Sequence, residues 1–249
     1  MMWSWCDGEV VKWYIYSREL YLPMMNRSMT GFDEDFILSK VKSLYEGADP
    51  AHDFSHVMRV YKNAKLIGHK EDANMQILLL SALLHDVCAL PKSIEKSAES
   101  NAKKLIMLET FLNDMDLPED VVENVQYAVE VHSFSKGLVP TTLEAKILQD
   151  ADRLDAMGAI GIARVFLVGG QLERKLYNFE DPFCTLREPD DQTWNLDHFF
   201  SKLLKLEFGM HTETGKKLAK RRGAVLRRYL SDLHKEISDE NNVEVDTWK

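Results

Sequence analysis

Three separated segments of the sequence combine histidine and aspartate with apolar residues that are typical of a protein core. They are AHDFSHVMRV at 51–60, LLHD at 83–86 and QDADRLDAMGAIG at 149–161. A charged carboxylate is costly to bury among apolar side chains unless it is paired or bound to a metal ion. Imidazole nitrogens and carboxylate oxygens together suit divalent ions of borderline or hard character. Each motif alone also fits a helix cap or a hydrogen-bonded core histidine, but the three together favour a metal site.

The spacing inside these segments places polar side chains on shared helix faces. Residues three or four apart are neighbours on a helix, so His56 shares a face with both His52 and Arg59. Asp152 and Asp155 are related in the same way. Two imidazoles and two carboxylates would leave open positions on a six-coordinate ion for water and a substrate oxygen. The pattern therefore indicates a metal centre with room for water and substrate beside the protein ligands.

The wider set of motifs resembles the HD-domain metal-dependent phosphohydrolases, and in particular the small bacterial and archaeal HD hydrolases. The resemblance covers about residues 33–237 and follows the order H…HD…D. The matching stretches are His52-Asp53-x-x-His56-x-x-Arg59-Val60, Leu84-His85-Asp86, His132-Ser133-Phe134, Asp150-Ala151-Asp152-Arg153-Leu154-Asp155, Gly158-Ala159-Ile160-Gly161 and HFFSKLLKLEFGMHTETGKKLAKRR at 198–222. This resemblance implies an all-α helical bundle with the metal site between central helices. It also implies hydrolysis of a phosphoester or phosphoanhydride, with a nucleotide as the expected substrate.

By this resemblance, one divalent ion (Mn, Mg, Co, Ni, Fe or Zn) would be held by four residues. These expected ligands are His56, His85, Asp86 and Asp152. Positive groups must balance the charge on the phosphoryl oxygens in the transition state. The candidates for that role are Arg59, Lys92, His132 and Arg153. Asp155 or Asp53 could orient water or a ligand histidine.

Other interpretations of these candidates stay open. Arg59 could pair with a nearby acid, His132 could cap a helix C-terminus, and Lys92 could be solvated in a loop. Asp53 could be a helix N-cap. Arg164 could bind substrate or form a salt bridge to Asp155 or Glu173.

Missing motifs separate the branches of the family. The residues after His85 are DVCALP, without the HDxxED acids of the guanosine-polyphosphate hydrolases, and the GYP motif of the HD-GYP phosphodiesterases is absent. Many close relatives have an aspartate at the position of Ala89. A catalytically weak, nucleotide-sensing regulatory protein is therefore the alternative function. A di-iron oxygenase would need further ligands, for which His132 is the only obvious candidate.

The composition restricts the partners. A net charge of −9 and a pI of about 5.4 disfavour nucleic acid or an anionic membrane as the main partner. The three cysteines, Cys6, Cys88 and Cys184, form no CxxC pair, so free thiols and a cytoplasmic location are expected. Phe199, Phe200 and Phe208 could support a homodimer, although core packing is the more common use of such residues.

Helical periodicity dominates the rest of the chain. Helices are predicted over 33–46, from Asp53 or Ser55 to about Gly68, and over 72–86, 94–113, 118–132, 141–170 and 195–236. The nearly uniform hydrophobicity of 72–86 predicts a central helix. The loop 178–194 is interpreted as a solvated loop or a lid over a pocket. Residues 33–237 are the expected domain and 238–249 a polar tail; residues 1–32 are an extension, or Met29 is the start.

Overall fold

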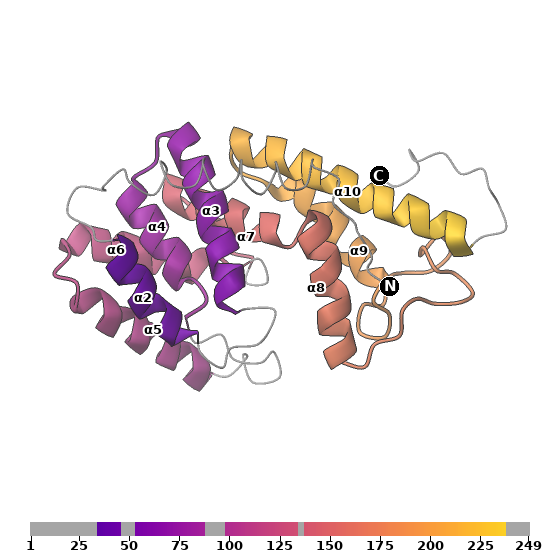
Figure 1. Cartoon of the computed structure of the whole chain (residues 1–249), viewed down its shortest axis with the longest axis horizontal. Coiled ribbons are helices and arrows are strands. Elements are labelled where there is room, and N and C mark those ends of the chain that lie inside the picture. The colour runs from indigo at the N-terminus through magenta and orange to yellow at the C-terminus, as the bar shows by residue number, and fades with distance from the viewer. Residues whose placement is uncertain (1–33, 46–52, 88–97, 134–136, 238–249) are drawn as a thin grey trace, which may run out of the picture. The chain divides into compact units, whose positions relative to one another are not determined.

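The computed structural model describes residues 34–45, 53–87, 98–133 and 137–237 of the chain. These residues form helices and irregular segments, and the described part contains only one isolated β-bridge, between Lys175 and Trp194. The predicted all-α fold is therefore confirmed (Figure 1). The chain divides into two compact units, 1–40 and 41–249. Of the first unit the structure describes only residues 34–40, which begin helix α2 (Glu34–Leu44); the question of Met29 lies outside the described residues.

The centre of the second unit is built from α3 (Phe54–Glu71), α4 (Met75–Leu84) and α7 (Leu143–Asp155). Helix α3 packs against both α4 and α7, and α4 also contacts α6 (Glu119–Val131). Every residue of α4 from Ile77 to Leu84 is buried because neighbours surround this helix. The prediction of a central apolar helix is confirmed. Helix α5 (Ala98–Asn113) packs against α6.

Short polar side chains determine where the central helices begin. Asp53 accepts a hydrogen bond from the backbone N–H of His56 at 2.9 Å and so caps α3. Asn74 caps α4 through the N–H groups of Gln76 and Ile77, and Thr142 caps α7. The N-cap interpretation of Asp53 is therefore correct, and α4 begins at Met75 rather than near residue 72.

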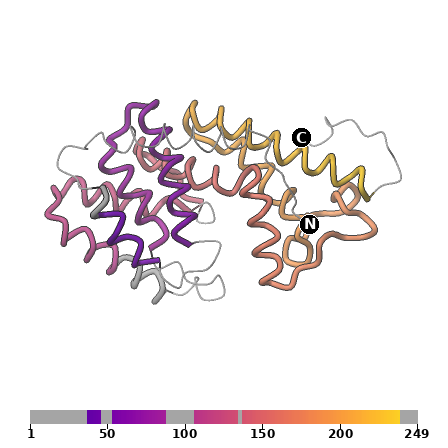
Figure 2. Tube along the Cα trace, in the orientation of Figure 1, coloured from indigo at the N-terminus to yellow at the C-terminus, as the bar shows by residue number. Residues whose placement is uncertain are grey.

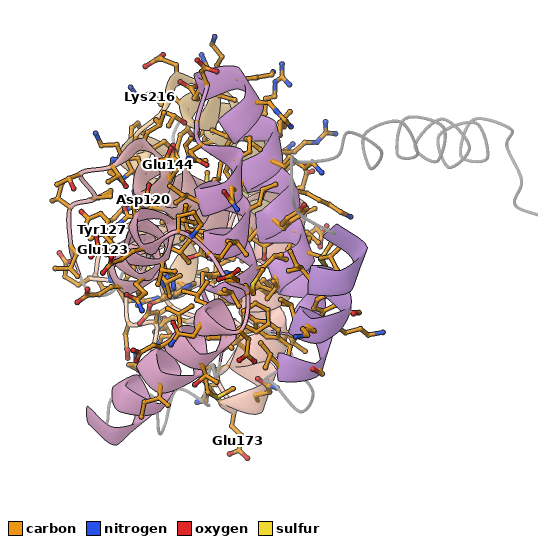
Figure 3. All side chains as sticks on the ribbon, turned by 90° about the vertical axis from the view of Figure 1, so that its left-hand side faces the viewer. Asp120, Glu123, Tyr127, Glu144, Glu173 and Lys216 are labelled. Atoms are coloured by element: carbon orange, nitrogen blue, oxygen red, sulfur yellow. The ribbon has the colours of Figure 1, made fainter. Side chains whose placement is uncertain are left out.

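Two contacts between neighbouring elements hold α4, α6 and α7 together. The Tyr127 hydroxyl group of α6 accepts a hydrogen bond from the backbone N–H of Thr141 at 2.9 Å, just before α7. The Glu144 carboxylate of α7 accepts one from the backbone N–H of Asn74 at 2.8 Å. Tyr127 and Glu144 are labelled in Figure 3. The first bond links the start of α7 to α6, and the second links the start of α4 to α7.

The prediction of one helix over 141–170 is wrong. Helix α7 ends at Asp155, and α8 (Gly158–Gln171) follows after a bend of 67°; Figure 2 shows the change of direction. Gly158 has a φ angle of +68°, which side chains with a Cβ rarely adopt. A Cβ atom at Gly161 would lie 2.3 Å from the carbonyl oxygen of Ala156. The two glycines therefore allow α8 to turn sharply against the end of α7.

The prediction of one helix over 195–236 is also wrong. The chain forms α9 (Asp197–Ser201), the 3-10 helix η2 (Leu203–Gly209) and α10 (Glu213–Ile237). Met210 is extended, with φ −76° and ψ 139°, and separates η2 from α10. Phe199 is fully buried and stacks on Tyr229, whereas Phe208 is 78% exposed. Helix α10 packs against α8, η2 and α7.

The loop predicted over 178–194 is irregular in the structure and is tied to α9. Asp197 accepts hydrogen bonds from Arg187 Nη2 at 2.8 Å and from the backbone N–H of Asp190 at 2.7 Å. Asp181 accepts bonds from the N–H groups of Thr185 and Leu186. Carboxylates thus hold the loop in place at both of its ends.

Among the described residues, no single helix has both the length and the hydrophobicity needed to cross a membrane, although the bent pair α7–α8 does by length and composition alone.

Candidate metal centre

Four helices bring histidines and aspartates together. His56 lies in the first turn of α3, and His85 and Asp86 directly follow α4. His132 directly follows α6, and Asp152 lies in the last turn of α7. The cluster therefore forms where the starts and ends of buried helices meet, which is why residues remote in sequence become neighbours.

The four expected ligands converge on one small volume. His56 Nε2 lies 3.2 Å from His85 Nε2, 3.4 Å from Asp86 Oδ2 and 3.7 Å from Asp152 Oδ1. His85 Nε2 lies 3.5 Å from Asp86 Oδ2. Ligand atoms of His56, His85 and Asp152 all lie within 4.8 Å of one another. The structure thus brings together the residues that the sequence predicts as ligands.

The outer nitrogens of the two histidines determine what their inner nitrogens can do. His56 Nδ1 lies 2.7 Å from Asp155 Oδ2, and His85 Nδ1 lies 2.8 Å from the carbonyl oxygen of Ala82. Both partners are acceptors, so each Nδ1 carries a proton and each neutral ring directs the lone pair of Nε2 inward. Two lone pairs and two carboxylates repel one another unless a cation lies between them. The donor set therefore fits a divalent metal ion.

The pKa values of His56, His85 and Asp86 agree with a site that attracts positive charge. Burial by itself would lower the pKa of His56, but hydrogen bonds with Asp155 and Asp86 raise it to about 9. Burial lowers the pKa of His85 to about 4. Burial would raise the pKa of Asp86, yet the neighbouring histidines hold it well below its ordinary value. The carboxylates of Asp86 and Asp155 thus favour a positive charge at His56, and Asp86 does so on the side where the ligand atoms converge.

Asp155 is a buried carboxylate that supports this arrangement from behind. Besides the bond from His56, it accepts hydrogen bonds from Arg59 Nε at 2.6 Å, Arg59 Nη2 at 3.1 Å and Arg164 Nη1 at 2.7 Å. Burial would raise the pKa of Asp155, but the bonds from His56 and Arg59 hold it well below the usual range. An ionised Asp155 fixes the orientation of the His56 ring, as is usual for residues that support a metal-ligating histidine.

The two arginines expected beside a phosphate have other partners. Arg59 uses Nε and Nη2 on Asp155 and Nη1 on the Ser55 hydroxyl group. Arg153 donates to the carbonyl oxygen of Gly209 and to Gln149 Oε1. The structure therefore places Arg59 in the support of Asp155, and Arg153 between α7 and η2.

His132 caps a helix and also lies beside one of the expected ligands. It is the C-cap residue of α6, and its Nδ1 lies 2.5 Å from the carbonyl oxygen of Val129. Its Nε2 lies 3.6 Å from Asp86 Oδ1. Burial would lower the pKa of His132, but Asp86 raises it. His132 therefore borders the cluster. Lys92 lies outside the described residues.

Gln149 is a supporting residue that the sequence analysis does not identify. Its side-chain amide is buried and donates to the carbonyl oxygens of Val131, at 2.6 Å, and Leu138, at 3.1 Å. It thereby fixes the end of α6, where His132 lies. The only feature of the sequence that could have identified Gln149 is its position: it is a polar residue directly before Asp150, in a helix with a buried apolar face.

Comparisons of this chain with a family model and with a relative agree with each other. The model of the HD domain family matches residues 53–157, which contain all four expected ligands. The protein YpgQ of Bacillus subtilis is 32% identical over 199 residues, which cover 79% of this chain and 90% of YpgQ.

Solved structures share the fold over a similar length. The crystal structure of Bacillus subtilis YpgQ in complex with ADP has a TM-score of 0.62 and 32% identity, covering 84% of this chain and 96% of YpgQ. That of an HD-superfamily hydrolase from Bacillus thuringiensis has a TM-score of 0.65 and 32% identity, covering 83% of this chain and 97% of the other. Both similarities extend well beyond the residues that the family model matches.

Proposed function

Because the chain belongs to the HD domain family, we propose that it is a divalent-metal-dependent phosphohydrolase that acts on a phosphate group of a nucleotide. The observation that carries the proposal is the approach of His56 Nε2 and His85 Nε2 to 3.2 Å, with carboxylate oxygens of Asp86 and Asp152 beside them. We take residues 33–237 as the domain that performs this function.

In this proposal, His56, His85, Asp86 and Asp152 hold one divalent ion. An ion bound there would act as a Lewis acid and make water a better nucleophile near neutral pH. Asp155 keeps the Nδ1 proton of His56 in place, so that Nε2 stays available as a ligand. Its role is therefore to position a ligand rather than to touch the substrate.

The residues around the ligands divide the remaining work. Arg59 stabilises the ionised form of Asp155, and Arg153 fixes α7 against η2. His132 lies beside Asp86, where its Nε2 can hydrogen-bond a ligand carboxylate or a substrate oxygen. A contact between Lys92 and a phosphate group stays a prediction. Arg59 and Arg153 thus contribute by holding the site together.

A nucleotide is the proposed substrate because a similar protein binds one. The crystal structure of YpgQ contains ADP, and YpgQ shares 32% identity with this chain over most of its length. The site also suits an anion when metal is bound, because Asp86 and Asp152 would balance but not exceed the charge of a divalent ion, and Arg59 and Arg164 lie beside it. A phosphate group is therefore the natural ligand for the open coordination positions.

The direct test is the release of phosphate or pyrophosphate from a panel of ribo- and deoxynucleotide mono-, di- and triphosphates. The protein would be stripped with EDTA and reloaded with Mn, with p-nitrophenyl phosphate as a non-nucleotide comparison. We expect turnover of at least one nucleotide that disappears in EDTA and in Asp86→Ala. Tight nucleotide binding without turnover with any divalent metal would instead indicate the nucleotide-sensing alternative and contradict the proposal.

A further inference from the structure

Asp155 faces two guanidinium groups although one is enough to balance its charge. Arg59 by itself contacts both oxygens of the Asp155 carboxylate, through Nε to Oδ1 and through Nη2 to Oδ2. His56 Nδ1 adds a further donor at 2.7 Å. Asp155 is therefore satisfied and neutralised without Arg164.

Arg164 uses only part of its hydrogen-bonding capacity. Nη1 donates to Asp155 Oδ2 at 2.7 Å. Within the part of the chain that the structure describes, Nε and Nη2 of Arg164 have no hydrogen-bond partner. All three nitrogens of Arg59, in contrast, are engaged by Asp155 and Ser55. The side chain of Arg164 is 19% exposed, so the rest of its planar fork faces limited solvent.

The bend between α7 and α8 brings Arg164 to the metal centre. Gly158 and Gly161 allow α8 to turn by 67° and to approach Ala156 closely. Arg164 follows Gly161 by three residues, on nearly the same helix face, and its Nη1 reaches 3.2 Å from Nδ1 of the ligand His56. The guanidinium is therefore held next to the ring of a proposed metal ligand.

Two guanidinium groups beside the centre share one carboxylate. Asp86 and Asp152 balance a divalent ion, and Asp155 balances Arg59. Arg164 is paired with the same carboxylate through Nη1 alone, so it shares its counter-ion with Arg59. A largely buried charge that lacks a full counter-ion is unfavourable until an anion binds, and the guanidinium fork matches the geometry of a phosphate group.

We propose that Arg164 binds a phosphate group of the substrate through its unused edge while Nη1 stays on Asp155. The inference rests on the proposed function, because the metal centre defines where the substrate lies. Arg164 is thus a substrate-binding residue, and Arg59, whose three nitrogens are already engaged, is a supporting one.

The experiment compares wild type, Arg164→Gln and Arg164→Lys by calorimetric titration of the Mn-loaded protein with ADP and with inorganic pyrophosphate, and of the stripped protein with Mn. The KM for the nucleotide that the wild type hydrolyses is measured in parallel. Arg228→Gln, which replaces an arginine that is 83% exposed on α10, is the control for loss of one positive charge.

We expect Arg164→Gln to weaken ADP or pyrophosphate binding by roughly tenfold or more, because the variant loses a charge-assisted hydrogen bond to phosphate. The Mn affinity of Arg164→Gln should stay within about twofold of the wild-type value. Arg164→Lys should recover part of the loss because it keeps the charge without the planar fork. Arg228→Gln should bind both probes like wild type.

Unchanged binding of both probes in Arg164→Gln would overturn the inference. A parallel loss of Mn affinity would overturn it too, because it would mean that Arg164 only supports Asp155. Wild type that binds ADP without hydrolysing any nucleotide would contradict the proposed function alone. If Mn-loaded wild type binds neither probe, both fail.

Discussion

Asp150 on α7 accepts hydrogen bonds from both the backbone N–H and the hydroxyl group of Thr212, at 2.8 and 2.7 Å. It also accepts one from the backbone N–H of His211 at 2.8 Å. The Asp150 side chain is fully buried and lies at the start of α10, where backbone N–H groups are otherwise unpaired. Two residues later on α7, Asp152 faces the candidate metal centre. One short segment therefore connects the C-terminal helix to the site.

Replacement of this carboxylate tests that connection. Asp150→Asn would place an amide donor against N–H donors, so we expect the free energy of unfolding to fall by about 2–4 kcal/mol. Urea denaturation followed by circular dichroism measures the change. Asp232→Asn, at a half-exposed position of α10, should change stability by less than about 0.5 kcal/mol. Equal stability of Asp150→Asn and wild type would show that the contact contributes nothing.

The support of His56 by Asp155 predicts a selective loss of metal affinity. Asp155→Asn removes the charge that holds the Nδ1 proton, and we expect Mn binding to weaken by about 10–100-fold. Asp191→Asn is a matched control, because Asp191 makes a similar 2.8 Å bond to Nδ1 of His198 outside the metal centre. Titration of the stripped proteins with Mn gives both affinities. Equal effects of the two variants would assign Asp155 a general structural role.

Metal removal should change the stability of the protein through the four proposed ligands, His56, His85, Asp86 and Asp152. A ligand at 100 times its dissociation constant stabilises the folded state by about 2.7 kcal/mol, which corresponds to a Tm rise of roughly 5–10 °C for a chain of this size. We expect Mn to produce this rise, EDTA to reverse it, and Asp86→Ala to abolish it while the helical spectrum is kept. Asp114→Ala, an exposed position, should keep the rise. A Tm of Asp86→Ala that still responds to Mn would remove Asp86 from the ligand set.

The close approach of α8 to α7 predicts opposite effects at two glycines of one helix. A Cβ at Gly161 would lie 2.3 Å from the Ala156 carbonyl oxygen, whereas Gly170 has no atom within 4 Å of the added Cβ. Gly161→Ala should destabilise the protein by about 2 kcal/mol or more, because backbone must move. Gly170→Ala should be neutral or stabilising by up to about 1 kcal/mol, since alanine favours helices. Denaturation midpoints that shift alike would contradict this explanation of the bend.

The general fold and the residues that meet at the candidate metal centre could be predicted because they depend on local patterns. The uniformly apolar segment ending at Leu84 requires a buried helix, and His85 and Asp86 must then lie at its end. The break after Asp155 could not be predicted, since Gly158 and Gly161 lie in an apolar run that also fits a continuous helix. Their role depends on Ala156 and Arg222, which contact them only in the folded structure.

The partners of the arginines could not be predicted for the same reason. Spacing places Arg59 on the face of His56, but it does not say whether a phosphate or Asp155 occupies the adjacent space. The choice depends on Asp155, 96 residues later in the chain. Arg153 likewise meets Gly209 and Gln149 because η2 and α10 separate at Met210, a break that helical periodicity does not indicate.

The central claim is that His56, His85, Asp86 and Asp152 bind a single divalent ion. Anomalous diffraction from crystals grown with Mn and ADP tests it most directly. We predict one strong peak between the four side chains, at about 2.0–2.3 Å from Nε2 of both histidines and from one oxygen of each aspartate. Absence of a peak there at saturating Mn, or a peak elsewhere with these four side chains uncoordinated, would contradict the claim.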